Sequence, residues 1–234
     1  MASNANLLPI KVWGKGGPNP PKVAIVVEEL GLPHEIVFVP ITDVKKPEYT
    51  AINPNGRLPA IHDPNTGLTL WESGAIIEYL VDRYDVDNKI SFPAGSNESY
   101  LTRQWLYFQV SGQGPYYGQA AWFSKFHPEK VPSALERYFN EIKRVQGVLE
   151  GHLKKQEELY GKEAGGPWLV GNKYTYADFA FLPWQAVLSL AFSEDVYSLS
   201  EAEFPVLKDW LARINAREPV ARAMGTLGTL APEK

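Results

Sequence analysis

The first part of the chain alternates short apolar runs with turns rich in proline and glycine. After the first run, Val23, Val26, Val27 and Leu30 recur at helical spacing, and Gly31 follows them where many helices end. This helix is predicted to join two parallel strands, and a hairpin and a helix over 74–85 come next. The runs that we interpret as strands are LPIKVW (8–13), HEIVFVPI (34–41), RLPAIHD (57–63) and LTLW (68–71).

The second part shows helical periodicity without strand signals. Long amphipathic helices begin near residue 98, and the glycines of 112–118 are expected to break one of them. Thr175 precedes an apolar run, and Asp178 three residues later completes an aspartate version of the helix capping box. We therefore predict an α/β thioredoxin-like N-terminal domain over 1–86, a linker over 87–97, and an all-α C-terminal domain over 98–234.

Composition and charge narrow the possible classes of partner. The 234 residues carry a net charge of -4 without a long basic run, so no nucleic-acid partner is expected. Cysteine is absent, which excludes a cysteine nucleophile, and the four histidines lack metal-ligand spacing. There is neither a signal-peptide pattern nor an apolar stretch near the ~18 residues of a membrane span. We expect a cytoplasmic protein that uses no metal and does not associate with a membrane.

One candidate for binding chemistry is the loop 53–57 with the Leu58–Pro59 dipeptide that follows it. A cis bond before Pro59 would leave the N–H and C=O of Leu58 facing outward, where they can pair with an extended peptide. The local sequence alone favours the trans form, because only ~5% of bonds before proline are cis. The sequence leaves both forms open.

A second candidate is the junction of Trp71, Glu72, Ser73 and Gly74, where a strand ends and a helix begins. Ser73 stands at the predicted cap position. A helix N-terminus binds anions, and Glu72 can accept a hydrogen bond from an ammonium group. The pair suits the α-carboxylate and α-amino groups of one amino acid. The alternative is an ordinary capped helix.

A third candidate is the glycine-rich loop that follows the first strand, at residues 14–19. Pro20 and Pro21 fit the first turn of the next helix, where no N–H is needed. Asn19 either caps this helix or directs an amide donor above the strand ends. The glycine spacing differs from the dinucleotide-binding fingerprint.

Taken in order, these motifs resemble the glutathione transferases over about residues 8–225. The segments near 105–120 and 126–145 are similar to a fungal class related to the yeast nitrogen-catabolite regulator (the Nu-like, Ure-type class). Bacterial members of that broad class reduce disulfides with glutathione. The family motifs are PNxxKVAIxxEELGL (18–32), NPNGRLPAI (53–61), LWESGAIIEYL (70–80) and LVGxKxTxAD (169–178).

The resemblance implies roles for individual residues and a cytosolic glutathione transferase fold. It implies a cis bond at Pro59, with the Leu58 backbone pairing to the cysteinyl unit of glutathione. It places Glu72 and Ser73 on the γ-glutamyl end and Asn19 near the thiol. Arg57 and Lys45 are the candidates for the glycyl carboxylate, whereas Val44 stands where relatives often carry a polar residue. Glutathione is then a co-substrate, and the family forms homodimers.

The residue types near the first loop limit how the thiol can be activated. A free thiol has a pKa of ~8.5, so little thiolate exists at neutral pH. The first tyrosine is Tyr49, and the only serine before Ser73 is Ser3, so no hydroxyl is available in this loop. By elimination, the expected donors to the thiolate are Asn19 and the helix N-terminus behind it. Asn19 is therefore the predicted catalytic residue.

The second substrate is expected to contact the all-α domain. Tyr116, Gln119 and Phe123 recur at helical spacing and form an aromatic wall suited to a small apolar electrophile or a disulfide. The alternative is core or dimer packing, which is also the interpretation for Trp105 and Phe108. The predicted activity is glutathione conjugation in detoxification, or disulfide or peroxide reduction. Alternatives are a non-catalytic regulator and a biosynthetic enzyme that adds glutathione to a secondary metabolite.

Overall fold

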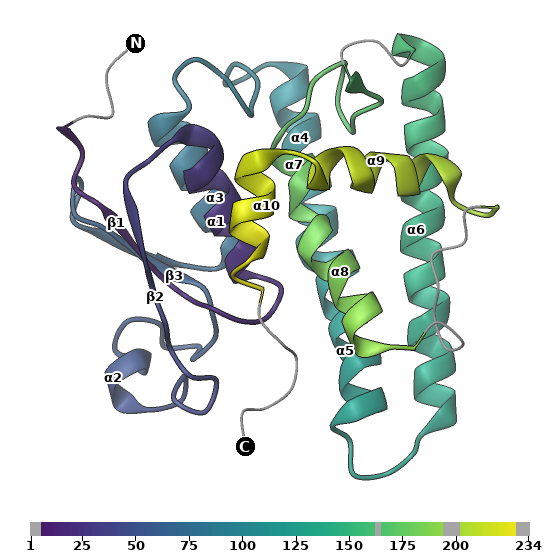
Figure 1. Ribbon diagram of the computed structural model, residues 1–234, viewed down its shortest axis with the longest axis horizontal. Coiled ribbons are helices and arrows are strands. Elements are labelled where there is room, and N and C mark those ends of the chain that lie inside the picture. Colours follow the sequence, from purple (N-terminus) through teal and green to yellow (C-terminus); the bar gives the residue numbers. More distant parts are fainter. Residues whose placement is uncertain (1–5, 162–164, 194–201, 228–234) are drawn as a thin grey trace. The chain divides into compact units, whose positions relative to one another are not determined.

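A computed structural model describes residues 6–161, 165–193 and 202–227 of the chain (Figure 1). The chain forms two compact units, which are described separately. The first contains the residues up to Ile90 together with those from Glu218 onward, and the second runs from Ser91 to Arg217. None of the helices in the described residues has the length and apolar run that a bilayer crossing requires.

The first unit is built on a four-stranded mixed sheet with the strand order β2-β1-β3-β4. β1 (Ile10–Trp13) pairs parallel with β2 (His34–Val37) and antiparallel with β3 (Ala60–Asp63), which pairs antiparallel with β4 (Leu68–Trp71). The strand–helix–strand–hairpin–helix order predicted from the pattern is confirmed. The strands are shorter than predicted, and β3 begins only after Pro59, which has no N–H to donate to a ladder.

Helices α1 (Pro20–Leu30) and α3 (Ser73–Tyr84) lie on one side of this sheet, and α10 (Glu218–Met224) packs against α1 (Figure 1). Gly31 ends α1 in the left-handed conformation with φ 63°, as the sequence predicts. The short helix α2 (Pro47–Thr50) is not apparent from the apolar pattern, because one helical turn is too short to show a period.

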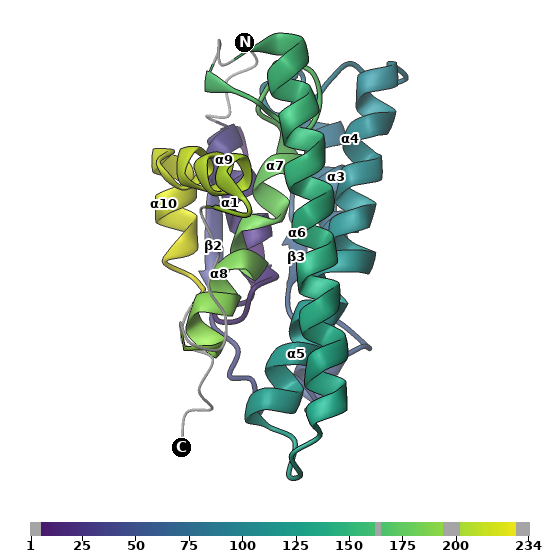
Figure 2. The same cartoon turned by 90° about the vertical axis from the view of Figure 1, so that its right-hand side faces the viewer.

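The second unit consists of helices in its described residues. They are α4 (Asn97–Phe108), a π-helical segment (Gln109–Gln113), α5 (Gly114–Lys125), α6 (Pro132–Tyr160), α7 (Tyr176–Ala180), α8 (Leu182–Ala191) and α9 (Pro205–Asn215). Figure 2 shows α6 as a long helix beside α5. The fold class predicted from the sequence, an α/β thioredoxin-like part and an all-α part, is confirmed.

The predicted helix break at residues 112–118 is wrong. The chain stays helical from α4 through the π-helical segment into α5. The side chains of Gln109 and Gln113 bond to each other at 2.9 Å, and Gln113 donates to the Phe181 carbonyl at 3.1 Å. A π-type turn absorbs the irregularity that the glycines indicate, and its buried amides find partners within the unit.

The predicted capping box is confirmed at the start of α7. The Asp178 carboxylate accepts the Thr175 N–H at 2.8 Å, while the Thr175 side chain caps the same turn. Asp178 also accepts the Leu169 N–H and the indole N–H of Trp210, both at 2.9 Å. This fully buried carboxylate therefore joins the preceding loop, α7 and α9.

The position of the C-terminal residues differs from the expectation that everything from 98 to 234 belongs to the all-α part. Residues from Glu218 onward group with the first unit. Val220 and Ala223 on α10 are buried there, as is Leu227 just beyond it. The division between the units falls between Ile90 and Ser91, inside the segment expected to be a linker.

Candidate functional site

The sheet register brings the three candidate motifs to one end of the strands of the sheet. Trp13 pairs with Ala60, and Ala60 pairs with Trp71. The loop after β1, the dipeptide before β3 and the junction after β4 therefore all leave the sheet side by side. A Cβ placed on Gly14 would lie 3.6 Å from the Leu58 Cβ, which shows how closely the first two approach.

The peptide bond between Leu58 and Pro59 is cis, as the family resemblance implies. Within the described residues, the backbone N–H and C=O of Leu58 have no hydrogen-bond partner. Buried or partly buried backbone groups are nearly always paired in proteins, with protein, water or ligand. An extended peptide laid along Leu58 would satisfy both groups.

The sequence analysis missed the residues that brace this loop. Asn53 is buried, and its amide donates to the Arg57 carbonyl at 2.6 Å while its carbonyl oxygen accepts the Asn55 N–H at 2.9 Å. The Tyr49 hydroxyl donates to the same Arg57 carbonyl at 2.9 Å. Burial raises the pKa of Tyr49 to about 12, against a smaller opposing effect of Asn53. An asparagine before proline signals a local side-chain turn, which is the clue that identifies Asn53.

The junction after β4 carries an unusual backbone conformation at Glu72, with φ 74° and ψ 114°. Non-glycine residues adopt positive φ rarely and at a cost, and such residues cluster at ligand-binding sites. Glu72 is the N-cap of α3, so the prediction that Ser73 caps the helix is wrong, and Ser73 is its first residue. The first helical bond runs from the Ile76 N–H to the Glu72 carbonyl.

Because the ladder of α3 begins with that bond, the N–H groups of Ser73, Gly74 and Ala75 are not used inside the helix. Three outward N–H groups at the positive end of a helix suit a carboxylate. The exposed Glu72 carboxylate stands next to them. The junction therefore carries groups that can pair with a carboxylate and with an ammonium group, and its role in holding the end of an amino acid stays a prediction.

Asn19 is half-buried at the N-cap position of α1, but its side chain makes no capping hydrogen bond. Pro20 and Pro21 occupy the first turn and carry no N–H, and the Lys22 N–H donates to the Asn19 carbonyl at 3.2 Å. The N-terminus of α1 can therefore attract an anion through the helix dipole, but it offers few N–H donors. This corrects the expectation that the helix N-terminus shares the donor role with Asn19.

Lys22 in the first turn of α1 is almost completely buried, with 1% of its surface exposed. Burial lowers its pKa to about 7, and the nearby Glu72 carboxylate opposes that shift. Buried lysines are rare because their charge loses its hydration. The residue links α1 electrostatically to the junction after β4.

The two candidates for the glycyl carboxylate lie on neighbouring loops. The ammonium group of Lys45 donates a hydrogen bond to the Asn55 carbonyl at 2.7 Å. Arg57 is exposed. Val44 is buried in a core cluster with Tyr49 and Ala60, so it presents no polar group to a ligand. Both basic side chains lie near the Leu58 loop, and their role toward the glycyl carboxylate stays a prediction.

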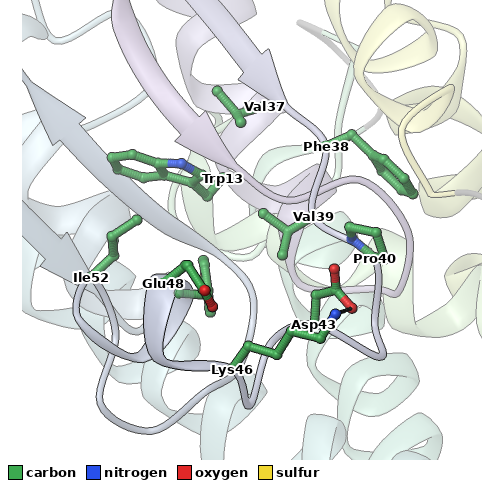
Figure 3. A pocket seen from close by; sticks show the side chains of 10 residues that line it. Trp13, Val37, Phe38, Val39, Pro40, Asp43, Lys46, Glu48 and Ile52 are labelled. Atoms are coloured by element: carbon green, nitrogen blue, oxygen red, sulfur yellow. Dashed lines mark ion pairs between the residues drawn. The ribbon is translucent and has the colours of Figure 1, made fainter.

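An apolar groove of about 440 Å³ lies beside these loops (Figure 3), and the six predicted glutathione residues are not among the ten that line it. Asp43 and Lys46 form an ion pair of 2.7 Å at its edge. The groove is lined by Trp13, Val37, Phe38, Val39, Pro40, Asp43, Lys46, Glu48, Tyr49 and Ile52.

In the second unit, the structure brings together two of the three residues predicted for the second substrate. The rings of Tyr116 and Phe123 lie 6.4 Å and 5.6 Å from the ring of Tyr138 on α6. Gln119 is exposed on α5. Trp105 is buried against Phe108, Phe181 and His152, so it serves packing.

No group of three or more histidine or acidic side chains that could hold a metal ion occurs in the described ranges of the chain. The candidate site consists of hydrogen-bonding and charged groups of the first unit. Its parts are the unpaired backbone groups of Leu58, the amide of Asn19, the start of α3 and the carboxylate of Glu72, which are together called the clamp.

This fold and clamp define a thioredoxin-like protein with an all-α partner unit. Family models for the N-terminal and C-terminal domains of glutathione S-transferase match residues 17–83 and 115–218. The chain belongs to the glutathione S-transferase family, and its relatives include the Ure2-like proteins.

Individual relatives cover nearly the whole chain. It is 60% identical to the glutathione S-transferase-like protein gedE of Aspergillus terreus, over 95% of this chain and 97% of that protein. It is 35% identical to URE2 of Saccharomyces bayanus, over 90% of this chain and 67% of that protein. Glutathione transferase URE2P6 of Phanerochaete chrysosporium, crystallised with oxidized glutathione, superposes with a TM-score of 0.83 at 48% identity, over 97% of this chain and 100% of that one.

Proposed function

We propose that this protein is a glutathione transferase that binds glutathione along the edge of the first unit and activates its thiol through Asn19. The observation that carries the proposal is the register of Trp13, Ala60 and Trp71, because it places the loop of Asn19, the backbone of Leu58 and the junction after β4 together.

Each part of glutathione finds a partner of suitable chemistry. The Leu58 N–H and C=O pair with the cysteinyl unit, and the start of α3 with Glu72 and Ser73 holds the γ-glutamyl end. Arg57 and Lys45 are the proposed partners of the glycyl carboxylate. The resulting order along the clamp directs the thiol toward Asn19.

The energy available from Asn19 matches what thiol activation needs. A hydrogen bond to a charged acceptor such as a thiolate stabilises that acceptor by ~1.5–3 kcal/mol. One pKa unit corresponds to about 1.4 kcal/mol, so one amide donor lowers a thiol pKa by about one to two units. With prolines in the first turn of α1, the amide of Asn19 carries most of this effect. Glutathione itself is then the nucleophile, and no protein side chain forms a covalent bond.

Replacing Asn19 by alanine tests this proposal. The pKa of bound glutathione should rise by about one unit, because the thiolate loses a charge-assisted hydrogen bond. The measurement is a titration of the thiolate absorbance of the complex, with Asn140→Ala on α6 as a control at an exposed asparagine. A titration of Asn19→Ala that matches the wild type would refute the role of Asn19.

The thiolate can then attack an apolar electrophile, forming a C–S bond as a leaving group departs. It can also attack a disulfide, forming a mixed disulfide as the original S–S bond breaks and its other sulfur leaves as a thiolate. Tyr116, Gln119 and Phe123 are the proposed contacts of this second substrate. Turnover of an aromatic halide would support conjugation, and turnover of a glutathione-containing disulfide or a peroxide would support reduction. The proposal includes a cytoplasmic role in detoxification.

A regulatory function is the second candidate, since the chain is 35% identical to a URE2 protein. Addition of glutathione to a secondary metabolite is a third. Retained affinity for glutathione without turnover of halides, disulfides or peroxides would favour the regulator over general conjugation and over reduction.

A further inference from the structure

The C-terminal segment Glu218–Leu227, here called the clasp, is an integral part of the first unit. Its helix α10 packs on α1, the helix that Asn19 precedes. Val220 is completely buried and Ala223 is 2% exposed, so an apolar face holds the clasp in place. Burying such a face is the main force that fixes a short helix whose own propensity is marginal.

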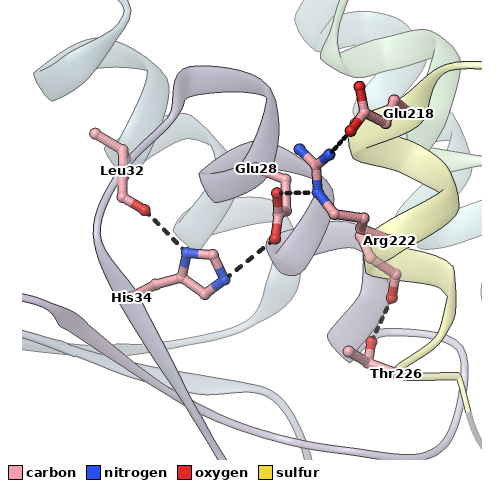
Figure 4. A network of polar contacts seen from close by, with 7 residues as sticks. Glu28, Leu32, His34, Glu218, Arg222 and Thr226 are labelled. Atoms are coloured by element: carbon pink, nitrogen blue, oxygen red, sulfur yellow. Dashed lines mark hydrogen bonds and ion pairs between the residues drawn. The ribbon is translucent and has the colours of Figure 1, made fainter.

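A network of polar contacts also joins α10 to α1 (Figure 4). Arg222 Nε lies 2.9 Å from Glu28 Oε2 on α1, and the Arg222 guanidinium also pairs with Glu218. The second oxygen of Glu28 faces His34 Nε2 at 3.6 Å, and the other ring nitrogen of His34 contacts the Leu32 carbonyl at 2.9 Å. The network therefore connects α10, α1 and the start of β2.

The clasp also reaches the loop that carries Asn19. The Gly16 N–H donates to the Thr226 carbonyl at 2.7 Å. The loop is otherwise tied at its two ends, where the Gly14 N–H donates to the Val37 carbonyl and the Asn19 carbonyl accepts from Lys22. Among the backbone hydrogen bonds of the described residues, the one to Thr226 holds the middle of this loop from outside it.

Thr226 is itself held rigidly. Its N–H and its hydroxyl both donate to the Ala223 carbonyl, at 2.9 Å and 2.7 Å. The Leu227 N–H continues the turn by donating to the Met224 carbonyl at 3.0 Å. The Thr226 carbonyl therefore presents a fixed acceptor, set by the packing of α10 on α1.

We propose that the clasp positions the Asn19 loop and so tunes the reactivity of bound glutathione, with Arg222 and Thr226 as positioning residues. The inference rests on the proposed role of Asn19. A hydrogen bond weakens steeply with poor angle, and a glycine-rich loop without a central anchor samples many conformations. Holding Gly16 reduces that freedom and keeps the Asn19 amide aimed at the thiol.

Two substitutions on α10 separate positioning from general effects of a new charge. Ala223→Glu places a carboxylate in the buried face and displaces the clasp, whereas Ala221→Glu adds the same charge on the exposed face of the same helix. We expect Ala223→Glu to raise the pKa of bound glutathione by about half to one unit. It should also speed hydrogen exchange at the Gly16 amide. Ala221→Glu should leave both at the wild-type value.

Arg222→Ala keeps the buried apolar face of α10. It therefore tests the same proposal if Ala223→Glu does not fold. Its matched control is Arg144→Ala. Arg144 Nε also lies 2.9 Å from a glutamate oxygen, and the two arginine side chains are 48% and 47% exposed. We expect Arg222→Ala to shift the thiol pKa and the Gly16 exchange in the same direction by a smaller amount, and Arg144→Ala to shift neither.

The proposed role of the clasp would be overturned if folded Ala223→Glu, or Arg222→Ala, kept both the wild-type pKa of bound glutathione and the wild-type rate of hydrogen exchange at the Gly16 amide. Melting temperature alone cannot decide, because a merely structural role lowers it without moving the thiol pKa. An unchanged pKa in Asn19→Ala would instead overturn the role of Asn19. The Gly16 exchange still reports on the clasp in that case, so the two failures are distinguishable.

Discussion

At the scale of single residues, the candidate site contains side chains and backbone that ordinary folding preferences disfavour. Glu72 has positive φ, Lys22 buries an ammonium group, and Asn53 buries an amide. Each of them costs free energy unless surrounding groups compensate, and Asn53 is compensated by its two hydrogen bonds in the loop. Strained and buried polar residues concentrated near one sheet edge are typical of a binding site.

Lys22 gives a prediction about stability and pH. Its pKa is lowered from 10.5 to about 7 in the folded state, so the unfolded chain binds the extra proton between these values. Stability from this group is therefore lowest below pH 7 and rises as the pH increases toward 10.5. Between pH 7 and 9 the gain is on the order of 2 kcal/mol.

Lys22→Met should remove the increase in the free energy of unfolding between pH 7 and pH 9. Denaturant unfolding at pH 7 and pH 9 checks the prediction, because the stability difference between variant and wild type should shrink at the higher pH. Lys11→Met on the exposed side of β1 is the control, and it should not change the pH dependence. Parallel pH profiles of wild type and Lys22→Met would show that the ammonium is not desolvated.

At the scale of elements, polar side chains decide how helices begin and join. Glu150 on α6 accepts the Leu207 N–H at 2.7 Å at the start of α9, where local sequence offers no cap. Trp184 of α8 packs so closely on α5 that a Cβ on Gly118 would lie 3.0 Å from its ring. The glycines predicted to break a helix therefore allow close packing instead.

Asp178 gives a prediction at this scale. Asp178→Ala leaves the N–H groups of Leu169, Thr175 and Trp210 without their buried acceptor. We expect a loss of about 3–5 kcal/mol in the free energy of unfolding. Urea unfolding checks it, with Glu141→Ala in a surface pair on α6 expected to cost less than ~1 kcal/mol. A similar small loss in both variants would contradict the linking role of Asp178.

At the scale of the whole molecule, the family implies a homodimer, and the outer face of α4 suits one. Tyr100, Leu101 and Tyr107 are exposed by 59%, 45% and 57% on this helix. Large exposed apolar side chains on one helix face are typical of a protein interface. We propose that this face of α4 contacts a second copy of the chain.

Tyr107→Glu should therefore shift the protein from dimer to monomer, because a charge in an apolar interface core loses its hydration without a partner. Light scattering coupled to size-exclusion chromatography measures the mass directly. Tyr160→Glu on α6 makes the same substitution at another exposed tyrosine and should leave the mass unchanged. A monomeric wild type, or a dimeric Tyr107→Glu, would contradict the assignment of this face.

Local sequence patterns were enough to predict the features that depend on neighbours along the chain. The period of Val23, Val26, Val27 and Leu30 predicted α1, Gly31 predicted its end, and the Thr175–Asp178 pair predicted a capped helix. These predictions succeed because helix periodicity and capping are set within a few residues. The resemblance to the family also predicted the cis bond before Pro59, although peptide bonds before proline ordinarily prefer the trans form.

The features that depend on contacts between distant residues could be read only from the folded chain. The pairing of Trp13, Ala60 and Trp71 assembles the clamp, and the bond from Gly16 to Thr226 ties the Asn19 loop to the far end of the chain. The positive φ of Glu72 and the burial of Lys22 are likewise visible only in the folded chain. Such contacts form because packing selects among many locally allowed conformations, and no pattern of neighbouring residues records that selection.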